Sequence, residues 1–197
     1  MQAVPETQRG FTLIEALIAF VILSVGLLGI VSLQALSKTS QHQAIQRSRA
    51  VTLADAMVER IRINPSAVQT YIASNPLGDD PNSPEPSPDC RTGPCDPNDL
   101  AAHDLWEWER ELAGVMVQAG GASAGGLIDP RGCITFTSTN GRLSTGIMRV
   151  AVQWRGLQET RDAVQGGEPV CAGAAAGTDA NRRQVVINTF VLDEDDL

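Results

Sequence analysis

The residue with the clearest chemical requirement is Glu15, because it is the single charge in the 26-residue apolar run 11–36. A helix of that length is about 39 Å long, enough to cross a hydrocarbon core of about 30 Å with some tilt. An acid inside such a segment costs of order a few kcal/mol at the bilayer centre and by default marks a functional site with a partner. The sequence therefore predicts a membrane-spanning helix in which Glu15 has a specific role.

The residues that precede the apolar run resemble a processing signal. The sequence RGFTLIE at residues 9–15 is similar to the class III signal of type IV pilins and pseudopilins. The resemblance implies that a prepilin peptidase removes the leader 1–10 by cutting after Gly10, and that the new N-terminal Phe11 is N-methylated. Glu15 then becomes the fifth mature residue and takes part in filament assembly, where the amine of a neighbouring subunit is its implied partner. Its own amine, one helical turn away, is the alternative partner.

A secretory signal peptide and a plain signal anchor are the alternatives for this segment. A secretory signal has a basic start, an apolar core of roughly 7–15 residues and a small-x-small cleavage site. In this chain the negative charge of Glu6 offsets the positive charge of Arg9, and the apolar run is longer than the core of a secretory signal. Residues 35–37 nevertheless resemble a small-x-small cleavage site. The positive-inside rule does not settle orientation, because basic residues also follow the span: Lys38, Arg47 and Arg49. A location of the C-terminal part outside the cytoplasm is therefore implied by the resemblance and by the cysteines.

Four cysteines follow the apolar run, at Cys90, Cys95, Cys133 and Cys171. An even number in an exported domain suggests disulfides, and four cysteines allow three pairings. We expect a short Cys90–Cys95 staple and a Cys133–Cys171 bond between distant strands. A zinc site is the alternative, but Cys-x4-Cys has no matching second pair and both histidines are remote in sequence. Free thiols are the third possibility.

The composition excludes several function classes. Removal of the leader leaves 187 residues (197 − 10), which suits one modest domain after the membrane segment. The net charge of −8 and the single lysine, Lys38, argue against a nucleic-acid-binding surface. The chain also lacks Gly-x-Ser-x-Gly, His-Glu-x-x-His and Walker sequences. We therefore predict a structural protein with no catalytic residues, metal or cofactor.

One helix is expected to continue beyond the membrane segment over residues 11–64. This range contains no proline, and Asn64-Pro65 is a plausible stop because the residue before proline resists the helical conformation. Its second half, 37–64, carries an amphipathic stripe made of Ala50, Leu53, Ala54, Met57, Val58 and Ile61. We expect residues 11–36 to lie in the membrane or filament core and residues 37–64 to pack on a globular head, 65–197.

Two further segments resemble the minor pilins of the PilV, or type IV pilus modification, family. The first is MVERIRINP at residues 57–65, in which Glu59 and Arg62 are spaced to pair on the helix surface. The second is residues 95–108, which share that family's pattern of cysteine, proline, leucine and tryptophan. Together with the signal, these segments imply a minor pilin.

Residues 74–98 contain seven of the eleven prolines, a density that neither a helix nor an internal strand tolerates. We expect an extended loop held by Cys90–Cys95. Calcium binding is an alternative because the loop and its end are acidic, although the spacing is not that of an EF-hand; the acids are Asp79, Asp80, Asp89, Asp96 and Asp99.

A short helix should follow this loop, with Asp96 as N-cap, Pro97 in the first position and an end near Gly114. Its apolar stripe consists of Ala101, Leu105, Trp108 and Leu112. Trp108 is then expected in the core, Trp106 partly exposed, and His103 on the surface.

The C-terminal part predicts an antiparallel sheet. Residues 120–126 are expected to form a loop, and strands are expected at 133–137, 148–154 and 185–191, the last two from their alternation of apolar and polar side chains. Residues 165–184 should form a loop tethered by Cys171, and the acidic run 193–196 should be a solvated tail. The predicted class is α+β, with the type IV pilin-like fold of a long helix packed on a small sheet.

The resemblance implies a function in assembly. A minor type IV pilin is held in the inner membrane by a single span with a periplasmic head, and then enters the pilus, at its tip in our prediction, where it helps to initiate assembly. The implied partners are other minor and major pilins, the prepilin peptidase, the inner-membrane assembly platform and a tip adhesin. Twitching motility and adhesion would follow from the pilus. A minor pseudopilin of a type II secretion system and a membrane-anchored module that never assembles are the alternatives.

Overall fold

The structure is a computed structural model that describes residues 10–73, 76–78, 80–123, 125–159, 171 and 180–196. Residues 1–9 of the leader and most of the loop 165–184 therefore lie outside the described residues. The chain divides into two compact units, Met1–His42 and Gln43–Leu197, and each is considered by itself.

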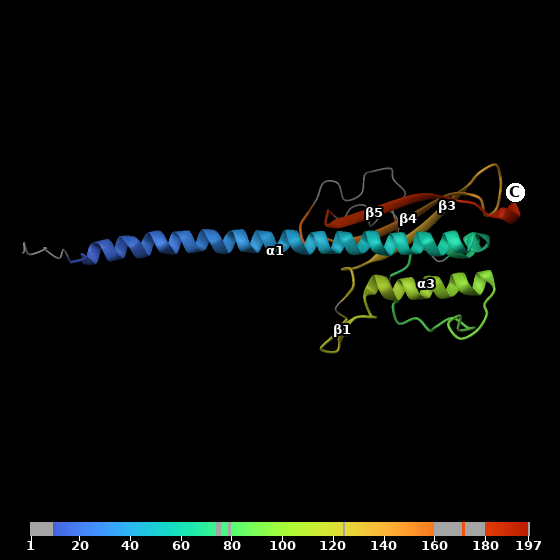
Figure 1. Cartoon of the computed structure of the whole chain (residues 1–197), viewed down its shortest axis with the longest axis horizontal. Helices are drawn as coiled ribbons and strands as arrows, with labels where there is room; N and C mark the ends of the chain where they lie inside the picture. The colour runs from blue at the N-terminus through green and yellow to red at the C-terminus, as the bar shows by residue number, and fades with distance from the viewer. Residues whose placement is uncertain are drawn as a thin grey trace, which may run out of the picture. The chain divides into compact units, whose positions relative to one another are not determined.

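The first unit is the beginning of α1, which extends from Leu13 to Ile63 and confirms the predicted long helix (Figure 1). Every large apolar side chain from Phe11 to Leu36 is exposed. The hydroxyl groups of Ser24 and Ser32 are satisfied locally, since Ser24 donates to the Val21 carbonyl (2.8 Å) and Ser32 to the Leu28 carbonyl (3.0 Å). The segment therefore presents an apolar surface without unpaired hydroxyl groups at these positions.

In the second unit, the remainder of α1 contributes one stripe to the core of the head. Its buried residues recur every three or four positions, as expected of one helical face, and are Gln46, Ala50, Ala54, Met57, Val58 and Ile61. After α1 the chain forms a short 3-10 helix, Pro65–Ala67, and α2, Val68–Ala73. The Asn64 side chain donates to the Pro97 carbonyl (2.7 Å), which ties the end of α1 to the start of helix α3, Pro97–Ala113.

Helix α3 extends from Pro97 to Ala113, as predicted. The Asp96 side chain accepts hydrogen bonds from the backbone N–H groups of Asn98 and Asp99, so it is the N-cap. Gly114 ends the helix in the left-handed conformation with φ of 70°, where the chain passes so close to Gly126 that no Cβ would fit. In Figure 1, α3 runs alongside the head part of α1.

The main sheet has three antiparallel strands in the order β3-β4-β5, which confirms the α+β class. The strands are β3, Arg131–Ser138; β4, Gly146–Arg155; and β5, Arg182–Val191. The core-facing side of β4 consists of Met148, Val150, Val152 and Trp154. The Cys133–Cys171 disulfide links β3 to the segment that precedes β5.

Three expectations were wrong in detail. Residues 120–126 are not only a loop, because β1, Gln118–Ala119, and β2, Ala122–Ser123, form a small hairpin there. Strand β4 is not half-buried throughout, since it is the central strand and Ala151 and Gln153 on its second face are also buried.

The acidic tail is the third difference. A 3-10 helix, Glu194–Asp196, begins there, and Asp193 is buried rather than solvated. The Asp193 N–H donates to the Thr145 hydroxyl (3.1 Å), and the Asp196 carboxylate accepts from the Ser144 N–H (2.6 Å). The tail is therefore fastened to the turn that precedes β4.

Candidate functional site

The first candidate site is the start of the first unit. Gly10 and Phe11 lie outside any helix, and both are exposed, Phe11 to 77%. Helix α1 begins directly afterwards, with the Thr12 carbonyl accepting from the N–H groups of Glu15 (3.1 Å) and Ala16 (3.2 Å). The Gly10–Phe11 peptide bond thus lies in exposed, non-helical backbone directly before α1.

Glu15 occupies the first turn of α1, with its residue exposed among apolar neighbours. Within the described ranges its carboxylate makes no hydrogen bond or ion pair. A negative side chain in the first turn interacts favourably with the positive end of the helix dipole. In an apolar environment, however, a carboxylate needs a specific cationic or hydrogen-bonding partner. The site therefore consists of one acid at the start of an apolar helix, with no side-chain partner among the residues that the structure describes.

The apolar surface that surrounds Glu15 is the second part of this site. Helix α1 is long enough and apolar enough near its N-terminus to cross a membrane. Exposed contiguous apolar surface of this extent marks a membrane or protein contact.

The second unit contains a polar network around Arg60 of α1. Its guanidinium donates to the Asp104 carbonyl (3.0 Å) and to the Glu111 carboxylate (3.1 Å), and lies 3.4 Å from a Glu107 carboxylate oxygen. One cation on α1 thus faces three acids on α3. Removal of Arg60 would leave partly buried acids uncompensated.

Tyr71 of α2 extends this network, because its hydroxyl donates to the Asp104 carboxylate (2.5 Å). Burial raises the pKa of Tyr71 above its ordinary value, and the bond to Asp104 adds to the effect. Burial likewise raises the pKa of Asp104, opposed by the hydrogen bond from Tyr71 and by the charge of Arg60. The network therefore links α1, α2 and α3 through polar contacts.

A second group of contacts fixes the proline-rich loop on α3. The Glu109 carboxylate accepts from the Gly78 N–H (3.1 Å), the Asp80 N–H (3.2 Å) and the Ser83 hydroxyl (3.3 Å). The Trp106 indole donates to the Ser83 carbonyl (2.9 Å). The loop is therefore held by side-chain contacts with α3 in addition to its disulfide.

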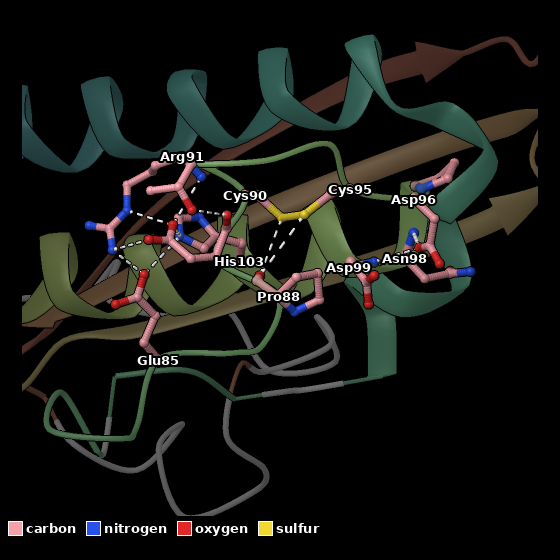
Figure 2. Close-up of a disulfide and its surroundings, with 12 residues drawn as sticks. Glu85, Pro88, Cys90, Arg91, Cys95, Asp96, Asn98, Asp99 and His103 are labelled. Atoms are coloured by element: carbon pink, nitrogen blue, oxygen red, sulfur yellow. Dashed lines mark hydrogen bonds and ion pairs between the residues drawn. A yellow bond between two sulfur atoms is a disulfide. The ribbon is translucent and has the colours of Figure 1, made fainter.

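The disulfide part of the loop is shown in Figure 2, where Cys90 is bonded to Cys95 beside His103. His103 was expected on the surface, but it is buried, with 3% exposed, because the loop covers it. Its Nε2 lies 3.4 Å from Glu85 and 3.8 Å from Asp89.

Glu85, Asp89 and His103 place their potential ligand atoms within 4.8 Å of one another, which is a geometry that could hold a cation. The Arg91 guanidinium, however, bonds to Asp89 (3.0 Å) and makes a short contact with Glu85. Hydrogen bonds from Arg91 hold the pKa of Asp89 below its ordinary value. Arg91 already supplies the cation of this cluster, so the arrangement is an ion-pair network.

The other predicted residues are placed as follows. Trp108 is fully buried and donates to the Leu53 carbonyl (3.0 Å), and Trp106 is half-buried, both as predicted. Glu59 and Arg62 form the expected pair at 3.0 Å. The Arg60, Tyr71 and Glu109 contacts were missed, because nothing in the local sequence indicates which distant groups they meet.

Comparison with known families gives two matches. The prokaryotic N-terminal methylation motif matches residues 7–31, and the type IV pilin Tt1218 family matches residues 32–106. No curated protein and no solved structure matches the chain.

The matched ranges contain the features described above. The first includes Gly10, Phe11 and Glu15, and the second includes the head part of α1, the proline-rich loop and the first half of α3. Type IV pilins are structural subunits rather than enzymes. The methylation motif and the apolar helix indicate membrane anchoring, a prepilin peptidase that recognises the chain, and association with other pilins. The chain is a type IV pilin.

Proposed function

We propose that this pilin is a minor subunit of the PilV kind that is cut after Gly10, N-methylated at Phe11 and incorporated at the pilus tip. The observation that carries the proposal is that the exposed apolar helix, with Glu15 unpaired among the described residues, begins directly after the exposed Gly10–Phe11 bond. A membrane anchor needs the apolar surface, but it does not need an acid in the first helical turn.

Cleavage supplies a cationic group that can pair with Glu15. Hydrolysis of the Gly10–Phe11 bond creates a cationic amine at the start of α1, where it adds to the positive end of the helix dipole. In the lone membrane subunit Glu15 is under-satisfied, and on docking it is neutralised by the amine of a neighbouring subunit. Because a carboxylate in an apolar environment is costly unless paired, this interaction favours the one axial position in which the two charges meet.

The minor-pilin assignment is supported by the sequence resemblance at residues 57–65 and 95–108. These segments are adjacent in the head, since Asn64 donates to the Pro97 carbonyl. The proposed partners are other minor pilins, the major pilin, the inner-membrane assembly platform and a tip adhesin. Before assembly the head would lie in the periplasm. The chain itself catalyses no reaction in this proposal, and motility or adhesion follows from the pilus that it helps to initiate.

The decisive experiment is intact-mass and N-terminal analysis of the protein recovered from sheared surface filaments. We expect a chain that starts at methylated Phe11, with a mass four hydrogens below the reduced value because of the two disulfides. Retention of the chain in the membrane with Met1 in place would contradict the proposal and support the anchored module.

Two deletion strains test the alternative of a pseudopilin. One lacks the type IV pilus platform and the other lacks the type II secretion platform. If filament recovery of the processed chain requires the type IV pilus platform, the proposal holds. Dependence on a type II secretion platform instead would overturn it.

A further inference from the structure

Strand β5 is the outer strand of the main sheet, and its second edge is open. In the described part of the chain, residues 184–191 form backbone pairs with β4 only. The opposite edge of the sheet is different, because Leu77 exchanges hydrogen bonds with Gly132 of β3 (2.9 and 2.8 Å). Among the residues that the structure describes, one edge is therefore partly covered by the chain itself, and the other presents N–H and C=O groups that have no backbone partner.

Beyond Arg182 and Arg183 at the start of β5, this edge has none of the usual protection. Native proteins discourage strand addition with lysine, proline, charged side chains or a bulge at an exposed edge. Residues 184–191, QVVINTFV, contain no charge, no proline and no glycine. Their register with β4 is continuous, without a bulge. The residues are mainly β-branched or aromatic, the types that favour strands. Such an edge readily pairs with another strand.

The side chains of β5 are also incompletely covered. Val185 and Ile187 on the core side and Val186 on the other side are half-buried. Phe190 is 52% exposed and lies directly opposite Ile147 of β4, which is 53% exposed. This pair forms an apolar surface next to the open edge, so an added strand would bury apolar side chains as well as backbone groups.

We propose that residues 184–191 receive an extended segment of a different pilus subunit, which becomes the fourth strand of the sheet. The inference rests on the proposed function, because assembly is what brings the two chains together. In this mode of recognition the backbone hydrogen bonds provide affinity and alternate side chains provide specificity. The segment that fits is uncharged and extended, with an apolar side chain beside Phe190.

A second copy of this chain is a less suitable occupant. A pair formed by two β5 strands would be two-fold symmetric and would close on itself. A filament is built from heterologous contacts, in which each subunit offers different surfaces to its neighbours. The open edge therefore fits a segment from another subunit, and self-pairing becomes an outcome of the test.

The test compares two lysine substitutions in the full chain. Thr135, Arg149 and Asn188 form one row across β3, β4 and β5, and both Thr135 and Asn188 are exposed. Asn188→Lys places a charge at the open edge, where a fourth strand would cover it. Thr135→Lys places the same charge on the same face, also next to Arg149, but on the opposite strand of the sheet.

We expect Asn188→Lys to lower recovery of the chain in sheared filaments by about tenfold, because a charge covered by a new strand is costly. Thr135→Lys should leave recovery unchanged. Thermal unfolding and cleavage after Gly10 should be normal in both variants, which separates strand addition from misfolding.

Photo-crosslinking in cells provides a second measurement, with a photoreactive phenylalanine analogue at position 188 or 135. An adduct between position 188 and an extended peptide of another pilus subunit, absent from position 135, is expected. An adduct with a second copy of this chain, or equal filament entry of the two lysine variants without an adduct at 188, would overturn the inference. If the wild-type chain itself is absent from filaments, the proposed function fails first, and the inference fails with it.

Discussion

Trp108 and Gly132 are in such close contact that a Cβ on Gly132 would lie 2.5 Å from the indole ring. Trp108 belongs to α3 and Gly132 to β3, so this contact sets how closely the helix approaches the sheet. The same indole donates to the Leu53 carbonyl of α1. One side chain therefore connects the three elements that form the core of the head.

Gly132→Ala should destabilise the head by about 1–3 kcal/mol, because the added methyl group must displace the indole or the strand. Urea unfolding of the purified chain, followed by tryptophan fluorescence, measures the change. Gly93→Ala is the matched control, since a Cβ at Gly93 meets no atom within 4 Å. Equal stabilities of the two variants would show that the contact is not tight.

The two disulfides should contribute unequally to stability. Cys133 and Cys171 are separated by 38 positions, whereas Cys90 and Cys95 are separated by 5. Loop-closure entropy then predicts losses of about 4 kcal/mol and about 2 kcal/mol when each pair is replaced by alanine. Denaturant unfolding of the two double variants checks the order. A larger loss for the Cys90–Cys95 pair would mean that the proline-rich loop stabilises the head by more than its closure entropy.

Asp104 should make the stability of the head depend on pH. Burial raises its pKa, so the folded head holds this proton more tightly than the unfolded chain does. The contribution of Asp104 to the free energy of unfolding is then fully present below the ordinary carboxyl pKa of about 4 and is lost as the pH rises through the folded-state pKa.

Asp104→Asn removes this titration while it keeps an acceptor for the Tyr71 hydroxyl. The urea midpoint of the wild type minus that of the variant is expected to decrease between about pH 3 and pH 7. An increase over this range would mean that the ion pair with Arg60 outweighs burial.

Glu15→Gln should reduce the entry of the chain into filaments by about tenfold, because the neutral amide cannot pair with the amine of a neighbouring subunit. Cleavage after Gly10 should continue, which shows that the variant still reaches the membrane. The amount of chain in sheared filaments, relative to that in the membrane, is the measurement.

Glu59→Gln is the control for Glu15→Gln, since it removes an exposed acid from the same helix and affects only the surface pair with Arg62. If Glu15→Gln entered filaments as well as this control, Glu15 would have no role in assembly.

Features that depend on neighbouring residues could be predicted from the sequence. The long helix follows from the absence of proline before Asn64-Pro65, and α3 follows from the Asp96 cap, Pro97 and Gly114. The class III signal is likewise contained in a few consecutive residues. Alternation predicts the second and third strands of the main sheet, β4 and β5. It predicts only one buried face for β4, because the central position of β4 depends on strands distant in sequence.

The tertiary structure alone decided which polar residues are buried. His103 lies off the apolar stripe of α3 and is covered by the proline-rich loop, and Asp193 in an acidic tail is buried beside Thr145. The three acids around Arg60 come together because two helices 33 residues apart pack side by side, as the spacing of Asn64 and Pro97 illustrates. Helical period and capping act over a few residues, whereas burial of a polar group depends on which distant segment covers it. The sequence by itself therefore determined the helix, its signal and the class of the fold, and the tertiary structure decided the polar contacts of the head and the open edge of β5.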